Sequence, residues 1–378
     1  MTEENAAREI NPAAANALAE CRRRTEAFCR SLGVMRPVLS APMSGVAGPE
    51  LVAAVSEAGG LGVLPTDGMT AGEIREAAAR VRELTRRPFA IQIRIAPRGV
   101  RDPAELRELA NGLSEVMTNL GLADPTTPEG EVFYDFACRR EGEAFAERFA
   151  AILEIRPAAA LSTCGGFREP EAEALFAAGI RNIGTATTLR EAKVLRAAKV
   201  DAIVAQGAEA GGPRSSFEDR DDVLTGLAAL VPAAARATRL PVIAAGGICD
   251  PAQALGACVM GASAVMLGTA LTGTRESLAS RHAKEALAWA GAANLVTTRL
   301  YSGRLVRALS SPLIDALADY AGRLPPWPAP ERLMRPLLKA AREQGREELE
   351  AVLLGQSVGR SLDASAAEAV RRISSLLA

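Results

Sequence analysis

The chain has 378 residues, of which 48% are hydrophobic and 24% charged, so it can bury a large core and gives no sign of disorder. A formal net charge of −1 provides no basic surface for nucleic acid or an anionic membrane, and no apolar run is long enough to span a bilayer. The six cysteines form no C-x-x-C pair and the N-terminus lacks a signal-peptide core, so we expect a cytoplasmic protein with reduced thiols and no metal.

A polar helical arm occupies residues 1–35, and after it short apolar segments alternate with helical ones. The apolar segments predict strands at 37–41, 61–64, 89–95, 158–162, 180–184, 202–206, 241–245 and 263–267. The segments between them predict helices at 49–58, 71–84, 141–155, 170–178, 188–198, 222–237 and 251–259.

Eight strands that alternate with helices indicate a parallel α/β protein, and several strands are apolar throughout, as strands buried on both faces are. The repeat number and a usual barrel length of about 250 residues favour a (β/α)8 TIM barrel. The alternative is a doubly wound sheet. That fold usually carries a glycine fingerprint after its first strand, where this chain reads APMSGV.

We therefore divide the chain into an N-terminal helical arm (1–35), a barrel (36–271) and a C-terminal region (272–378). The barrel contains an insertion at 96–140 that is rich in proline, glycine and charge. The C-terminal pattern is helical, broken by the proline-rich stretch 324–333 that leads to two terminal helices. We expect an additional helical layer that packs on the barrel and forms a lid over its mouth.

The most informative stretch runs from Val242 to Leu271. One apolar strand ends in Gly246-Gly247, and the next ends in Gly268-Thr269, with a short helix between them. Glycines let backbone N–H groups approach an anion closely, and a helix N-terminus favours negative charge. In a (β/α)8 barrel a phosphate site commonly follows strands 7 and 8, which is where these glycines fall.

Polar residues and glycines follow the other strands at the same end of the barrel, where active sites form. Gln92 is a polar residue inside an apolar strand, and a buried amide needs a partner, either a cofactor edge or the neighbouring backbone. Cys164 follows the fourth strand and would be reactive only near a cation or helix end; a buried, inert thiol is the alternative.

The chain has a single histidine, His282, in a segment that reads as the charged face of a helix. A surface position explains it better than a catalytic role does. Catalysis by Ser-His-Asp or Cys-His groups, and metal sites built on histidine, are therefore disfavoured.

The segments APMSGVAGPELVAAVSEAGGLGVL, AQGAEAGGPR, VIAAGGI, VMLGTA and YSGRLVRAL resemble the nitronate monooxygenase family, formerly called 2-nitropropane dioxygenases. The resemblance covers roughly residues 36–360 and implies an FMN-dependent flavoprotein barrel, a scaffold shared with enoyl reductases and NADH:quinone reductases. It implies that the following residues contact the flavin or its phosphate: Ala41, Pro42, Met43, Gln92, Thr185, Gln206, Gly211, Gly212, Gly246, Gly247, Gly268 and Thr269.

The chain departs from the family after the sixth strand. Many members read A-G-G-H there, and the resemblance implies that their histidine is the base that deprotonates a neutral nitroalkane; here the residue is Pro213. The next residue, Arg214, either holds an anionic substrate or pairs at the surface with Glu218 or Asp219. Catalytic residues remain unassigned, with Arg214, Glu209, Cys164 and Tyr301 as candidates.

Three functions follow from this pattern. The first is an FMN-dependent monooxygenase that oxidises an anionic, nitronate-like small molecule with O2. The second is an NAD(P)H-dependent FMN reductase of a quinone or an enoyl thioester, because hydride transfer needs no histidine. The third is an FMN-binding barrel without catalysis. The sequence leaves open whether the protein forms a homo-oligomer.

Overall fold

The computed structural model describes residues 11–95, 141–217, 223–320, 327, 329–358 and 364–377. Its centre is an eight-stranded parallel sheet in the order β1-β9-β8-β6-β5-β4-β3-β2. The two outer strands meet through a parallel bridge between Leu39 and Leu61, with the Leu61 amide 2.9 Å from the Val38 carbonyl. The sheet therefore curls into the expected (β/α)8 barrel.

The predicted strands agree with the observed ones to within one or two residues. The observed bounds are β1 Val38–Ser40, β2 Gly62–Leu64, β3 Phe89–Arg94, β4 Ala159–Thr163, β5 Arg181–Ala186, β6 Ala202–Gln206, β8 Val242–Ala245 and β9 Ala264–Leu267. The helices that surround them are α2 Pro49–Glu57, α3 Ala71–Leu84, α6 Glu141–Ile155, α7 Glu169–Ala177, α8 Leu189–Ala197, α9 Leu227–Thr238 and α10 Pro251–Val259.

The predicted helix at 222–237 began too early. Residues 223–226 are not helical, and α9 starts at Leu227 after Gly226, whose backbone is extended. The Glu209 carboxylate accepts hydrogen bonds from the Leu227 amide at 2.9 and 3.0 Å. A carboxylate from a distant loop thus sets the helix start, which a local pattern does not reveal.

The region after β9 is only partly helical. It contains α11 Thr269–Thr272, α12 Arg281–Trp289, α13 Pro312–Ala316, α14 Ala329–Glu343 and α15 Ala366–Ile373, with short 3₁₀ turns at Ala292–Asn294, Ala318–Tyr320 and Glu347–Leu349. It also contributes β10 Leu295–Thr298 and β11 Val306–Leu309 to a small antiparallel sheet. In this sheet β11 pairs with β10 on one side and with β7, Gly212–Pro213, on the other. The sequence analysis expected the helices of this layer but not its two strands, because such short strands acquire their pairing only from tertiary contacts.

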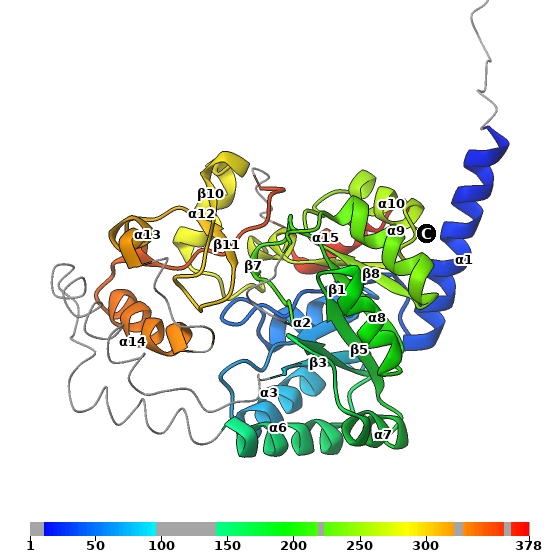
Figure 1. Ribbon diagram of the computed structural model, residues 1–378, viewed down its shortest axis with the longest axis horizontal. Coiled ribbons are helices and arrows are strands. Elements are labelled where there is room, and N and C mark those ends of the chain that lie inside the picture. Colours follow the sequence, from blue (N-terminus) through cyan, green and yellow to red (C-terminus); the bar gives the residue numbers. More distant parts are fainter. Residues whose placement is uncertain are drawn as a thin grey trace, which may run out of the picture.

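Figure 1 shows β10, β11, α12, α13 and α14 grouped on one side of the barrel, whereas α15 lies back among the barrel helices. Buried residues of α15, Ala369 and Val370, belong to the same apolar cluster as Leu51 and Val55 of α2. α14 and α15 correspond to the two predicted terminal helices, but α14 begins at Ala329, inside the proline-rich stretch, because proline is tolerated in the first turn of a helix. The predicted insertion at 96–140 lies outside the described residues.

The helix α1, Pro12–Leu32, closes the N-terminal end of the barrel. Phe28 and Leu32 pack with the apolar side chains of the barrel interior, such as Leu39 and Ile243. Gly33 ends the helix in the left-handed conformation and turns the chain toward β1. No helix in the described ranges combines the length and apolar character that a membrane crossing requires.

Replacing Phe28, which is 2% exposed, with alanine should lower the free energy of unfolding by about 3–5 kcal/mol, because it empties the bottom of the barrel core. Leu18 lies in the same helix but is 39% exposed, so Leu18→Ala should change stability by no more than about 0.5 kcal/mol. Urea denaturation of both variants measures the free energies of unfolding. Equal losses would contradict the packing of Phe28 against the barrel core.

Candidate active site

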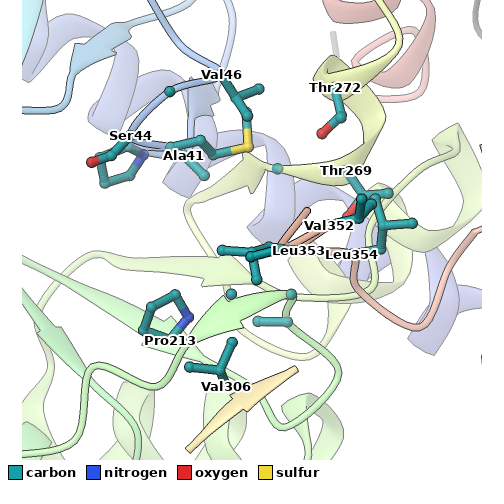
Figure 2. Close-up of a pocket in the computed structure, with 18 of the residues that line it drawn as sticks. Ala41, Ser44, Val46, Pro213, Thr269, Thr272, Val306, Val352, Leu353 and Leu354 are labelled. Atoms are coloured by element: carbon teal, nitrogen blue, oxygen red, sulfur yellow. The ribbon is translucent and has the colours of Figure 1, made fainter. Parts of the chain in front are cut away.

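A cavity of about 900 Å³ lies at the carboxyl ends of the barrel strands. This volume is at the upper end of the range typical of small-molecule and cofactor sites. Loops after the barrel strands form one wall, and the C-terminal region forms the other (Figure 2). Figure 2 places Ala41, Ser44 and Val46 on one side of the space and Pro213 and Val306 on the other.

The structure brings together every residue that the resemblance assigned to the cofactor. These residues come from six different strand ends, and all of them line the cavity: Ala41, Pro42, Met43, Gln92, Thr185, Gln206, Gly211, Gly212, Gly246, Gly247, Gly268 and Thr269. The strand ends of the barrel thus gather these residues around one space.

The loop after β8 contains Gly246-Gly247, and the loop after β9 contains Gly268-Thr269. The two loops lie side by side because β8 and β9 are neighbours in the barrel. Gly246 and Gly247 have φ values of +120° and +66°, which residues with a Cβ rarely adopt. A Cβ at Gly268 would make ordinary van der Waals contacts with Ala41 Cβ at 3.7 Å and Met43 Sδ at 3.8 Å, so no clash requires glycine there. We call Gly246, Gly247, Gly268 and Thr269 the glycine cup.

The amide of Gln92 is bonded within the protein. Its oxygen accepts from the Thr66 amide at 3.2 Å, and its nitrogen donates to Asp67 Oδ1 at 3.3 Å and Thr163 Oγ1 at 2.9 Å. Both N–H groups therefore have partners, and the alternative of an amide satisfied by its neighbours describes Gln92 better. It lines the cavity but does not need a ligand to complete its hydrogen bonds.

Thr185 behaves differently. Its side chain lines the cavity from the end of β5, and its hydroxyl is buried without a hydrogen-bond partner among the described residues. A buried hydroxyl normally has a partner, because burying one without a hydrogen bond costs about 1–3 kcal/mol. Thr185 thus fits a site that receives a polar group of a bound molecule.

Arg214 is not a surface arginine. It is 2% exposed, it lines the cavity, and its Nη1 donates to the carbonyls of Gln206 at 3.0 Å and Gly207 at 2.6 Å. The Gln206 side chain forms two hydrogen bonds with the same loop. Its Nε2 donates to the Pro213 carbonyl at 3.1 Å, and its Oε1 accepts from the Ser215 amide at 2.8 Å. The suggested partners Glu218 and Asp219 lie outside the described residues.

Two further arginines support this loop from the C-terminal region. Arg304 donates to the Ser216 carbonyl at 2.7 Å, and Arg307 donates to the Ala208 carbonyl at 2.9 Å. Burial and the nearby cation of Arg214 lower the pKa of Arg307, although Glu209 partly opposes this. Arg214 and Arg307 are therefore close enough to interact, and two neighbouring cations near the Pro213 wall attract anions.

Glu209, a catalytic candidate from the sequence, does not line the cavity. Its carboxylate is held by the first amide of α9, as described above, and therefore serves as the cap of that helix. The structure removes Glu209 from the set of groups that could reach a substrate in the cavity.

Cys164 and Tyr301 do line the cavity. Cys164 directly follows β4 and is partly exposed, so of the expected buried or inert thiol the burial is not observed. Its φ of +62° is unusual for a residue with a side chain. The Tyr301 hydroxyl lies 3.2 Å from Ser311 Oγ, and burial raises the pKa of the tyrosine. Tyr301 therefore stays protonated at neutral pH.

An ion-pair group that the sequence analysis missed connects the barrel with α14. Arg94, the last residue of β3, contacts Asp67 Oδ2 and Glu331 Oε2, each at 2.6 Å. Glu331 also accepts from the Trp327 indole at 2.8 Å and from Arg335 at 3.2 Å. The only signal in the sequence was an arginine at the end of an apolar strand, and its partner on α14 is 237 residues away.

This group sets the charge state of its members. Burial opposes ionisation of Arg94, but Asp67 and Glu331 outweigh it and raise the pKa of the guanidinium. Burial likewise acts to raise the pKa of Glu331, yet Arg94, the Trp327 indole and Arg335 hold it below its ordinary value. Glu331 is therefore a carboxylate at neutral pH and a weak base.

Pro213, at the position where the resemblance implies a histidine, is part of the cavity wall. Pro213 sits in β7, opposite Val306 of β11, and Figure 2 shows Leu353 facing the same space. The chain's one histidine, His282, lies in α12 and does not line the cavity. No group of three or more His, Cys, Asp or Glu side chains in the described parts of the chain is arranged to hold a metal.

Comparison with known proteins agrees with this geometry. The family model described as "Nitronate monooxygenase" matches residues 26–375. The nitronate monooxygenase of Pseudomonas aeruginosa is 37% identical over 351 residues, covering 92% of this chain and 98% of that protein.

Two solved structures share the fold. The nitroalkane oxidase of Streptomyces ansochromogenes aligns with a TM-score of 0.80 at 30% identity, covering 93% of this chain and 98% of that one. FabK from Thermotoga maritima aligns with a TM-score of 0.69 at 22% identity, covering 93% and 95%, which supports the fold alone. From the site geometry, the match across almost the whole length and the level of identity, the chain belongs to the nitronate monooxygenase family of flavin-dependent oxidoreductases.

Proposed function

We propose that the protein is an FMN-dependent oxidoreductase that oxidises an anionic, nitronate-like substrate with O2. The observation that carries the proposal is Pro213, which lies in the cavity wall where many family members have a basic histidine. Proline has no ionisable group, so the neutral acid form of such a substrate would find no base at this position.

Three of the carboxylates that line the cavity already have partners within the protein. Asp67 and Glu331 are engaged by Arg94, and Glu331 has a lowered pKa. Glu350 accepts a hydrogen bond from the Ser280 hydroxyl and pairs with Arg342. A substrate that arrives already ionised avoids the proton transfer that these groups are poorly placed to perform.

The cationic side of the cavity supports an anionic substrate. Arg214 lines this wall, with Arg307 and Arg304 behind it. These cations are partly or wholly removed from water, where charge interactions are stronger than at the surface. In the proposal all three raise the local concentration of an anion, and Arg214, which lines the cavity, orients its oxygen atoms.

The residues present also fit a flavin mononucleotide. The glycine cup would hold the single phosphate, the backbone of Ala41, Pro42 and Met43 would lie beside the ring, and the orphan hydroxyl of Thr185 would gain a partner. When bound, the flavin accepts electrons from the substrate and passes them to O2. The chain's own side chains position both molecules and hold the charge of the substrate.

The heat-released cofactor of the purified protein should have the mass of FMN and not that of FAD. Gly247→Asp should lose the cofactor while keeping the fold, because unit charges about 4 Å apart repel by roughly 4 kcal/mol at an effective dielectric constant of 20. Asp and Asn both tolerate the positive φ of this position, and either Cβ would lie 3.0 Å from Glu209 Cβ, so Gly247→Asn is the matched neutral control.

Mass spectrometry, flavin absorbance and circular dichroism on the same samples measure these outcomes. A mass of FAD would contradict the choice of cofactor. Wild-type flavin occupancy in Gly247→Asp would contradict the position of the phosphate.

The protein should consume O2 with a pre-ionised nitronate and not with the freshly dissolved neutral nitroalkane. Pro213→His should increase turnover of the neutral form by about 10²–10⁴-fold, the usual contribution of a positioned base, whereas Pro213→Asn should not. Oxygen-electrode rates recorded before the two forms equilibrate test this.

Equal wild-type rates on both forms would show that another base operates and would refute the assignment to Pro213. If neither form reacts but NADH or NADPH bleaches the flavin anaerobically, the protein is a reductase. If none of these compounds bleaches it, the barrel binds a flavin without catalysis.

A further inference from the structure

Three consecutive residues of the C-terminal region, Gly355, Gln356 and Ser357, lie across the ends of three barrel strands; we call them the strap. The Gly355 amide donates to Thr269 Oγ1 at 2.8 Å, after β9. The Gln356 amide donates to the Glu209 carbonyl at 2.9 Å, after β6. The strap thus joins loops after different strands, and its Ser357 lies 148 positions after Glu209 in the sequence.

Ser357 makes the third attachment, to the loop after β8. Its hydroxyl donates to the Gly247 carbonyl at 2.6 Å and accepts from Gln253 Nε2 at 3.1 Å. The Ser357 carbonyl accepts from Cys249 Sγ at 3.0 Å. This one residue therefore contacts the backbone of the glycine cup and the first turn of α10 at the same time.

The contact with Gly247 determines the direction of a peptide group. In a trans peptide the carbonyl of one residue and the N–H of the next point in opposite directions. Holding the Gly247 carbonyl against Ser357 therefore also fixes the direction of the Ile248 N–H. Gly247 has no Cβ and a φ of +66°, so its own conformational preference would not hold this peptide in place.

The strap can reach these loops only because glycine stands on both sides of the contact. A Cβ added to Gly211 would lie 2.4 Å from the Leu354 carbonyl carbon and 2.5 Å from the Gly355 nitrogen. A Cβ added to Gly355 would lie 2.9 Å from the Glu209 carbonyl oxygen. Figure 2 shows Leu354 beside Thr269, at the edge of the cavity.

We propose that Ser357 is a positioning residue for the cofactor phosphate, acting through Gly247, and that the strap couples the C-terminal region to cofactor retention. The inference rests on the proposed function, because it takes the glycine cup to be the phosphate site. Ser357 already uses its proton on Gly247, so its role is to hold the cup in shape for the anion. Since strap and cofactor favour the same loop conformation, each stabilises the other.

The test is the dissociation constant of FMN, measured by flavin fluorescence on deflavinated protein. Ser357→Ala should weaken FMN binding about tenfold, the effect of one lost hydrogen bond, and Ser357→Thr, which keeps the hydroxyl, should restore most of it. Ser56→Ala is the matched control, because Ser56 also donates to a carbonyl, Pro88 at 2.9 Å, and accepts from an amide, Gly62 at 3.1 Å. It is remote from the cup and should leave FMN affinity unchanged.

Hydrogen exchange on the wild-type protein gives a second readout that needs no variant. Adding FMN should slow exchange at the Gly355 and Gln356 amides, because the cofactor stabilises the loops that accept their hydrogen bonds. Wild-type affinity in Ser357→Ala, an equal loss in Ser56→Ala, or unchanged exchange at the strap would each overturn the inference while leaving FMN binding intact. A wild-type protein that binds no FMN would instead overturn the proposed function and this inference with it.

Discussion

The cavity depends on the close approach of the Leu354–Gly355 backbone to Gly211. Only glycine permits this approach, because a Cβ at Gly211 would overlap the Leu354–Gly355 peptide. The contact draws the C-terminal region onto the strand ends and gives the barrel mouth a second wall. Without it, the loops after β6, β8 and β9 would face solvent, and an exposed site favours charged and polar interactions far less than an enclosed one.

The opposite side of the cavity is held by ions. Arg94, Asp67 and Glu331 keep 17%, 16% and 21% of their side-chain exposure, so the pairs are largely removed from water. Such pairs contribute little net stability, because desolvation offsets their attraction, but removing one partner leaves an uncompensated charge. Arg94 therefore acts chiefly to specify where α14 docks, while apolar contacts of Met334 and Leu337 within the C-terminal region supply the burial.

The two walls place different chemistry around one space. The glycine loops and the Thr185 hydroxyl suit a polar, anionic cofactor, and the arginines behind Pro213 suit an anionic substrate. Val306, Val352 and Leu353 also line the cavity, and their side chains carry no group that could transfer a proton. This division agrees with an oxidoreductase in which the cofactor carries the electrons and the protein supplies position and electrostatics.

Much of the barrel could be predicted from the sequence because its signals are local. Short apolar strands, helix caps such as Thr70 and Thr188, and glycine pairs at strand ends each follow from neighbouring residues. Parallel strands present their carboxyl ends at one rim of a barrel. The residues predicted to contact the cofactor, from Ala41 to Thr269, were therefore expected together, and they line one cavity.

Other features depended on partners that are distant in the chain. The start of α9 depends on Glu209, the docking of α14 on Arg94, and the pairing of β7 on β11. For Gln92 the sequence left a cofactor edge or neighbouring groups as partners, and in the structure Thr66, Asp67 and Thr163 accept or donate its hydrogen bonds. The sequence by itself determined the secondary-structure pattern, the barrel and the set of residues at its mouth. Only the tertiary structure decided which of those residues face the cavity, because a side chain's partners are chosen by packing between segments that local patterns do not relate.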